Sequence, residues 1–139
     1  MRTAHPSESA TQQGLIRWWS FVCKQYGLPD FALMGFPLQG ARTARNGARL
    51  KAEGMRAGTP DLFLAVPVGS KPGLWIEMKT PIGTLTPAQK SFRDYLSRSY
   101  AHHVCKGLDE ARTVIDRYLK GTKALVPTTE VTALPPHTP

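Results

Sequence analysis

The chain has few cysteines and no long apolar segment. Its 139 residues include only two cysteines, Cys23 and Cys105, and neither lies in a CxxC pattern, which argues against a zinc site or a disulfide framework. No segment approaches the roughly 20 consecutive apolar residues of a membrane helix. The N-terminal region lacks the apolar stretch of a signal peptide. We therefore expect reduced thiols, no association with a membrane and a cytoplasmic location.

Acidic residues are also scarce. The chain has 10 Asp and Glu residues against 18 Lys and Arg residues, a formal net charge of +8. A basic balance favours a polyanionic partner, above all nucleic acid, although small basic proteins without such a partner also exist. Burying an unpaired carboxylate is costly, so the few carboxylates that lie within apolar segments are informative.

Two apolar segments carry such carboxylates. Asp61 lies in GTPDLFLAV, Glu77 and Lys79 lie in LWIEMKT, and a dense turn signal, PVGSKPG, separates the two segments. Side chains alternate between the faces of a strand, so Glu77 and Lys79 point the same way. An antiparallel hairpin that turns near Gly69 places Asp61 opposite Glu77, because both are equally far from Gly69 in the sequence. Two carboxylates and an ammonium group at one sheet edge suit binding of Mg²⁺ or Mn²⁺ and activation of water against a phosphodiester.

Residue periodicity predicts the order helix, three strands, helix, strand, helix, apart from one short helix between the first two strands. The expected helices are 7–26, a short one at 48–55, 86–99 and 108–119, and the expected strands are 31–37, about 61–67, about 73–79 and 102–105. Ser7 is a predicted N-cap, as is Thr86, and Phe92, Tyr95 and Leu96 are predicted to form the buried face of the helix at 86–99. This order predicts one α/β domain over residues 1–120, with a small mixed sheet flanked by helices, and a disordered Pro/Thr-rich tail over residues 121–139.

Taken together and in order, these motifs resemble those of PD-(D/E)xK nucleases, and more narrowly the virus-type replication-repair nuclease (VRR-NUC) family. The matching positions run through most of residues 8–119: Glu8 and Gln12, Asn46-Gly47, Leu50-Lys51, Gly58-Thr59-Pro60-Asp61-Leu62, Glu77-Met78-Lys79 and Leu85-Thr86-Pro87-Ala88-Gln89. Each motif is weak alone, and the specificity comes from their presence together. The resemblance implies a restriction-endonuclease-like α/β core.

The resemblance also implies roles for individual residues. The implied metal ligands are Glu8, Asp61, Glu77 and the backbone carbonyl of Met78, and the implied catalytic residues are Asp61, Glu77, Lys79 and Gln89. The family includes small stand-alone members, often phage-encoded, and resemblance to them implies a homodimer that acts on branched DNA. The resemblance therefore implies Mg²⁺ or Mn²⁺ as cofactor, branched DNA as substrate and the cytoplasm of a bacterial or phage-infected cell as location.

Some of these residues have simpler explanations that the sequence leaves open. Glu8 is an acid in the first turn of a helix, where the helix dipole favours it. Gln89 follows Thr86 by three residues and completes a capping box, so it is either a helix cap or an active-site hydrogen-bond donor. Helical spacing places Trp19 in the core, whereas Trp18 and Trp75 remain undecided between packing and stacking on bases.

A cluster of cations precedes the segment that contains Asp61. Phosphate contacts suit such a cluster, and so does a purely solvated face. The residues that we expect to contact DNA are Arg42, Arg45, Arg49, Lys51 and Arg56.

The sequence thus predicts a metal-dependent DNA endonuclease that is selective for four-way junction or flap DNA, in replication, repair or recombination. One alternative is a nuclease-fold module that binds DNA without cutting it, and another is a sequence-specific restriction-type endonuclease. A small basic structural or partner-binding protein would explain the charge, but it would leave the arrangement of Asp61, Glu77 and Lys79 as coincidence.

Overall fold

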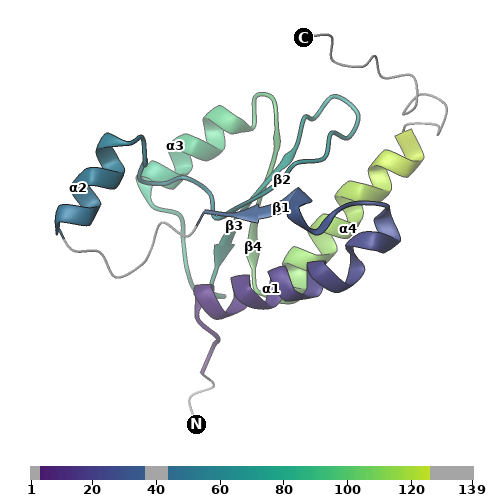
Figure 1. Ribbon diagram of the computed structural model, residues 1–139, viewed down its shortest axis with the longest axis horizontal. Coiled ribbons are helices and arrows are strands. Elements are labelled where there is room, and N and C mark those ends of the chain that lie inside the picture. The colour runs from purple at the N-terminus through teal and green to yellow at the C-terminus, as the bar shows by residue number, and fades with distance from the viewer. Residues whose placement is uncertain (1–3, 37–43, 126–139) are drawn as a thin grey trace.

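The computed structural model describes residues 4–36 and 44–125, with the side chains of residues 4–36 and 46–121. Figure 1 shows a sheet with α1 and α4 on one side and α3 on the other. The elements are α1 (Glu8–Val22), η1 (Cys23–Tyr26), η2 (Asp30–Ala32), β1 (Leu33–Gly35), α2 (Ala44–Ala52), β2 (Leu62–Leu64), β3 (Leu74–Lys79), α3 (Pro87–Leu96), β4 (Ala101–Lys106) and α4 (Leu108–Leu125).

The four strands form one mixed sheet in the order β1-β2-β3-β4. The pairs β1–β2 and β2–β3 are antiparallel, whereas β3 and β4 are parallel and are joined through α3. A parallel pair needs a crossover of this kind, because a tight turn cannot bring the chain back to the same end of the sheet. The predicted α/β fold, a small mixed sheet flanked by helices, is confirmed.

The β2–β3 hairpin has the register that the sequence predicts. Leu62 pairs with Ile76, Phe63 with Trp75 and Leu64 with Leu74. Continuing this register by one residue places Asp61, just before β2, opposite Glu77 of β3. The local signals that fix this register are the alternation of apolar residues and the turn between the strands.

One face of the sheet packs against α1 and α4 and forms the core. Alternate residues of β2 and β3 form the sheet side of this core. On the helix side, Trp19 of α1 is buried, and its Nε1 donates a 2.8 Å hydrogen bond to the backbone carbonyl of Asp30. The buried residues of this core include Leu15, Leu62, Leu64, Leu74, Ile76, Met78, Cys105, Ala111, Ile115 and Leu119. The other face of the sheet is therefore left for Glu77, Lys79 and their neighbours.

Several predicted boundaries differ from the structure. The short helix expected at 48–55 spans Ala44–Ala52, and the strand expected at about 61–67 is only Leu62–Leu64. The helix expected at 7–26 is α-helical only to Val22 and continues as the 3-10 helix η1, which ends at Gly27 with φ at 71°. The first strand is shorter than 31–37, because a 3-10 turn occupies residues 30–32. The helix expected to end at residue 119 runs to Leu125. Residues 126–139 lie outside the described part of the chain.

The predicted buried face of α3 is wrong at one position. Tyr95 is 66% exposed, whereas Leu96 and Gln89 are buried. These two residues are seven positions apart, two helical turns, so they mark the stripe of α3 that faces the sheet, and Tyr95 lies beside that stripe.

Both cysteines are buried and unpaired. Among the described helices, none has the length and apolar character needed to span a bilayer.

Candidate active site

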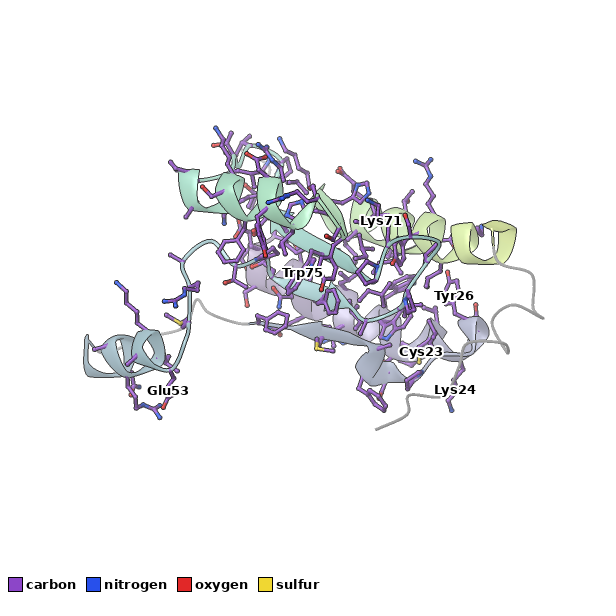
Figure 2. All side chains as sticks on the ribbon, turned by 90° about the horizontal axis from the view of Figure 1, so that it is seen from above. Cys23, Lys24, Tyr26, Glu53, Lys71 and Trp75 are labelled. Atoms are coloured by element: carbon purple, nitrogen blue, oxygen red, sulfur yellow. The ribbon has the colours of Figure 1, made fainter. Side chains whose placement is uncertain are left out.

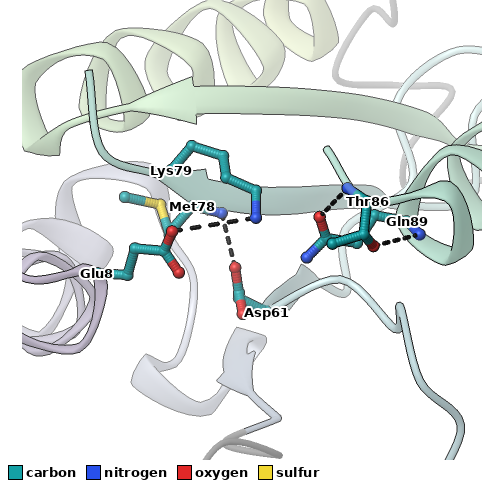
Figure 3. Close-up of polar contacts among 6 residues, drawn as sticks. All are labelled: Glu8, Asp61, Met78, Lys79, Thr86 and Gln89. Atoms are coloured by element: carbon teal, nitrogen blue, oxygen red, sulfur yellow. Dashed lines mark hydrogen bonds and ion pairs between the residues drawn. The ribbon is translucent and has the colours of Figure 1, made fainter. Parts of the chain in front are cut away.

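Asp61 and Glu77 face each other at the start of β2 and near the end of β3. Asp61 accepts a 2.7 Å hydrogen bond at Oδ2 from the backbone N–H of Met78 (Figure 3). Glu77 is only 2% exposed. Burial raises its pKa from 4.5 to about 9, and the hydrogen bond and negative charge of Asp61 act in the same direction, while Lys79 opposes them. Burial and the neighbouring Asp61 therefore favour the protonated form of Glu77.

Lys79 is buried beside this pair and lies near Glu8. Its side chain is 8% exposed, and Nζ is 4.0 Å from Oε1 of Glu8, whose side chain is 31% exposed. Glu8 reaches this place from the first turn of α1, which begins where the predicted N-cap Ser7 accepts a 3.0 Å hydrogen bond from the N–H of Ala10. Glu8 is thus both an acid in the first turn of α1 and a neighbour of Lys79 at the candidate site.

The structure brings two of the predicted metal-binding carboxylates together and places the third against the lysine. In the described part of the chain, no three His, Cys, Asp or Glu side chains are grouped closely enough to hold a metal ion. Glu8 lies beside Lys79, and its negative charge also helps to raise the pKa of Glu77, so it borders the carboxyl pair as well.

Gln89 forms a helix cap, which is one of the two roles that the sequence left open. Its Oε1 accepts a 2.9 Å hydrogen bond from the N–H of Thr86, and Oγ1 of Thr86 accepts a 3.2 Å bond from the N–H of Gln89, so the capping box is confirmed. Capping uses only the amide oxygen. The amide nitrogen points toward the space between Asp61 and Lys79 (Figure 3), so a donor remains directed at the site.

Two glycines allow the backbone to approach closely around Asp61. Gly58 has φ at 88°, and a Cβ there would lie 2.6 Å from the backbone carbon of Ala88, so the segment leading to Asp61 packs directly on the start of α3. A Cβ on Gly35 would lie 2.8 Å from Nε2 of Gln12. Gln12 thus approaches β1 next to Asp61, as a neighbour of the carboxyl pair.

The predicted DNA-contacting cations lie away from this centre. Both views show α2 standing apart from the sheet (Figures 1 and 2). Arg49 is exposed and lies 3.8 Å from Glu53, and Lys51 and Arg56 are exposed as well. Arg42 lies outside the described residues, and so does the side chain of Arg45. The cations that the structure describes are therefore exposed, on α2 and on the segment 53–60 that connects it to Asp61.

Sequence reasoning missed a group of aromatic neighbours of the site. Trp75, which the sequence left undecided, packs with Phe63, Phe36 and Tyr100. Trp75 precedes Glu77 by two residues and therefore lies on the same face of β3. The alternation that identifies Glu77 and Lys79 also contains this signal.

The sequence model of the VRR-NUC domain family matches residues 39–109, about half of the chain. The chain belongs to the VRR-NUC family. A solved structure described as a VRR_NUC domain protein is similar to it, with a TM-score of 0.70 and 29% sequence identity over 85% of this chain and 92% of that one. A comparison with curated proteins finds no match. The span matched to VRR-NUC contains Asp61, Glu77, Lys79 and Gln89, whereas Glu8 lies before it, and family membership identifies the domain as nuclease-fold.

Proposed function

We propose that this VRR-NUC protein is a metal-dependent DNA endonuclease that hydrolyses phosphodiester bonds at Asp61, Glu77 and Lys79. The observation that supports this most is the pair of facing carboxyl groups with a buried ammonium group beside it. Buried ionisable groups cost stability unless they are well paired. Strongly perturbed carboxyl groups are typical of functional sites.

Mg²⁺ or Mn²⁺ fits the donors that Asp61 and Glu77 present. Their oxygens are hard ligands, and without a cation the burial of Glu77 and the nearby Asp61 favour the protonated form of Glu77. A divalent cation would neutralise both groups without a third carboxylate, because Mg²⁺ usually keeps several waters. The backbone carbonyl of Met78 is a further proposed ligand. When bound, such an ion polarises the phosphate and lowers the pKa of a bound water.

The remaining groups of the site orient the reactants. Lys79, held near Glu8, positions the attacking water and offsets negative charge that develops on the phosphate oxygens. The water oxygen bonds to phosphorus and loses a proton to solvent. The P–O bond to the leaving oxygen, on the opposite side, breaks, and that oxygen takes up a proton from solvent. The amide nitrogen of Gln89 donates to a phosphate oxygen and fixes its orientation. Arg49, Lys51 and Arg56 contact flanking phosphates, which carry no sequence information.

We propose branched DNA, a four-way junction or a flap, as the substrate and a homodimer as the active form. The family resemblance supports this substrate class. A single domain of this size covers little duplex, and a symmetric pair suits a symmetric junction. We also propose that the protein acts on DNA in the cytoplasm.

The test is cleavage of end-labelled four-way junction, flap and linear duplex DNA in Mg²⁺, in Mn²⁺ and in EDTA. The key variant is Lys79→Met, which keeps an aliphatic side chain at a buried position and removes the charge. We expect metal-dependent cutting that falls by about 100-fold or more in this variant. Lys24→Met, the same substitution at an exposed position on η1, is the control and should cut like the parent.

The other candidate functions give different results in the same assay. Salt-sensitive DNA binding without cutting in either metal would contradict an endonuclease and support a binding module. A defined cut site in linear duplex would support a restriction-type enzyme.

A further inference from the structure

The site face of the sheet carries an aromatic patch next to the two carboxyl groups. The patch consists of Met34, Phe36, Phe63 and Trp75. Met34, Phe63 and Trp75 are aligned across β1, β2 and β3 in one row. The next row contains Asp61 and Glu77, and Phe36 joins it, because the N–H of Phe36 donates a 2.7 Å hydrogen bond to the backbone carbonyl of Asp61.

The rings of the patch support one another without closing its surface. The ring centroids of Phe63 and Trp75 are 4.5 Å apart, and those of Phe36 and Trp75 are 5.7 Å apart. Tyr100 packs edge-on against Phe63 and Trp75 from beside β4. Met34 is 39% exposed, and the three rings of the patch are half-buried. Trp75 is labelled near the centre of the sheet in Figure 2.

Trp75 also contains an unusual polar atom. Its Nε1 is the one side-chain nitrogen or oxygen that is fully buried without a hydrogen-bond partner in the described part of the chain. A buried donor without an acceptor is costly, and such an exception needs an explanation. Because Nε1 is fully buried, a base on the surface of the patch does not reach it. The match between the patch and a nucleobase rests on their flat aromatic faces.

We propose that the aromatic patch binds an unpaired nucleobase adjacent to the phosphate that is cut, an inference that rests on the proposed function. Trp75 and Glu77 are two residues apart on one strand, about 7 Å. This separation is comparable to that between a base and its own phosphate. Aromatic side chains on a sheet bind single-stranded bases by stacking in this way. Because paired bases are already stacked inside a duplex, the substrate must present an unpaired nucleotide at the cut.

The test compares two single strands of equal charge, each about ten nucleotides long. One is oligothymidylate, and the other has the same sugar-phosphate backbone without bases. Binding is measured in EDTA, where no metal-dependent cutting occurs. The parent should bind oligothymidylate about tenfold more tightly than the abasic strand, because stacking on one ring has this magnitude. Trp75→Leu should reduce this ratio to about one.

Phe21→Leu is the matched control, because it removes a 76% exposed ring from α1, a helix that packs on the opposite face of the sheet. This variant should keep the parental ratio. If Trp75→Leu does not fold, as judged by circular dichroism, Phe36→Leu at the edge of the patch takes its place and should lower the ratio.

Equal binding of both strands by the parent would overturn the proposal, and so would a parental ratio in the folded patch variant. Because binding is measured without metal, a protein that fails to cut still gives a result for the patch. Conversely, cutting without any preference for bases would reject the patch and leave the nuclease intact.

Discussion

Replacement of Glu77 by glutamine should stabilise the metal-free protein at neutral pH, although it removes a group of the candidate active site. Burial, together with the hydrogen bond and charge of Asp61, raises the pKa of Glu77 from 4.5 to about 9. Folding at neutral pH therefore requires this carboxyl group to take up a proton. Glutamine is neutral at every pH and has nearly the same shape, and its NH₂ group donates to Asp61 as the protonated carboxyl group does.

The magnitude follows from the linkage between protonation and folding. A carboxyl group with a raised folded-state pKa imposes no penalty below its unfolded pKa, and it lowers stability as the pH rises from the unfolded toward the folded value. Above pH 4.5 this penalty grows by about 1.4 kcal/mol per pH unit, which gives about 3 kcal/mol at pH 7. We therefore expect Glu77→Gln to gain about 1–3 kcal/mol at pH 7, with little gain near pH 5.

The assay is urea unfolding in EDTA, followed by circular dichroism, from about pH 5 to about pH 8. Glu53→Gln is the control, because the side chain of Glu53 is 59% exposed on α2, and it should show no comparable gain that grows with pH. Mg²⁺ should then stabilise the parent more than Glu77→Gln. The reasoning is refuted if Glu77→Gln is less stable than the parent at pH 7, or if its gain is the same at both ends of the pH range.

Further substitutions test the surroundings of the site. Gly58→Ala should lower the free energy of unfolding by about 2–4 kcal/mol, because φ is 88° and the new Cβ meets the backbone of Ala88. Gly47→Ala in α2 is the control and should not lower it, because nothing lies within 4 Å of the new Cβ. Equal effects of the two substitutions in denaturant melts would contradict this reasoning. Thr86→Ala should lower the free energy of unfolding by about 1 kcal/mol and slow cleavage, because it releases Gln89 from the capping box. Thr86→Ser should restore both stability and cleavage. Unchanged cleavage in Thr86→Ala would show that the cap does not affect the site. Tyr118→Phe should cost about 1 kcal/mol in the same melts, because the hydroxyl donates a 2.6 Å bond to the carbonyl of Val66, and it should leave cleavage unchanged.

The sequence alone was sufficient for features that depend on local spacing. The pairing of Leu62 with Ile76, and hence of Asp61 with Glu77, follows from strand alternation around a turn. The caps at Ser7 and Thr86 follow from hydrogen bonds between residues three apart. The extension of α4 beyond residue 119 was missed, because a Pro/Thr-rich composition downstream obscured where helix formation stops. The exposure of Tyr95 was missed, because periodicity gives a helical stripe but not its exact angle to the sheet.

Only the tertiary structure decided the chemistry of the site. The raised pKa of Glu77 depends on burial and on the distance to Asp61, neither of which a sequence contains. Glu8 and Lys79 meet because the start of α1 reaches the end of β3, across most of a domain's length in sequence. The separation of α2 from the sheet and the grouping of Phe36, Phe63 and Trp75 depend likewise on how distant segments pack. Local periodicity fixes which side chains share a face, whereas burial and long-range contacts fix their charge and their partners.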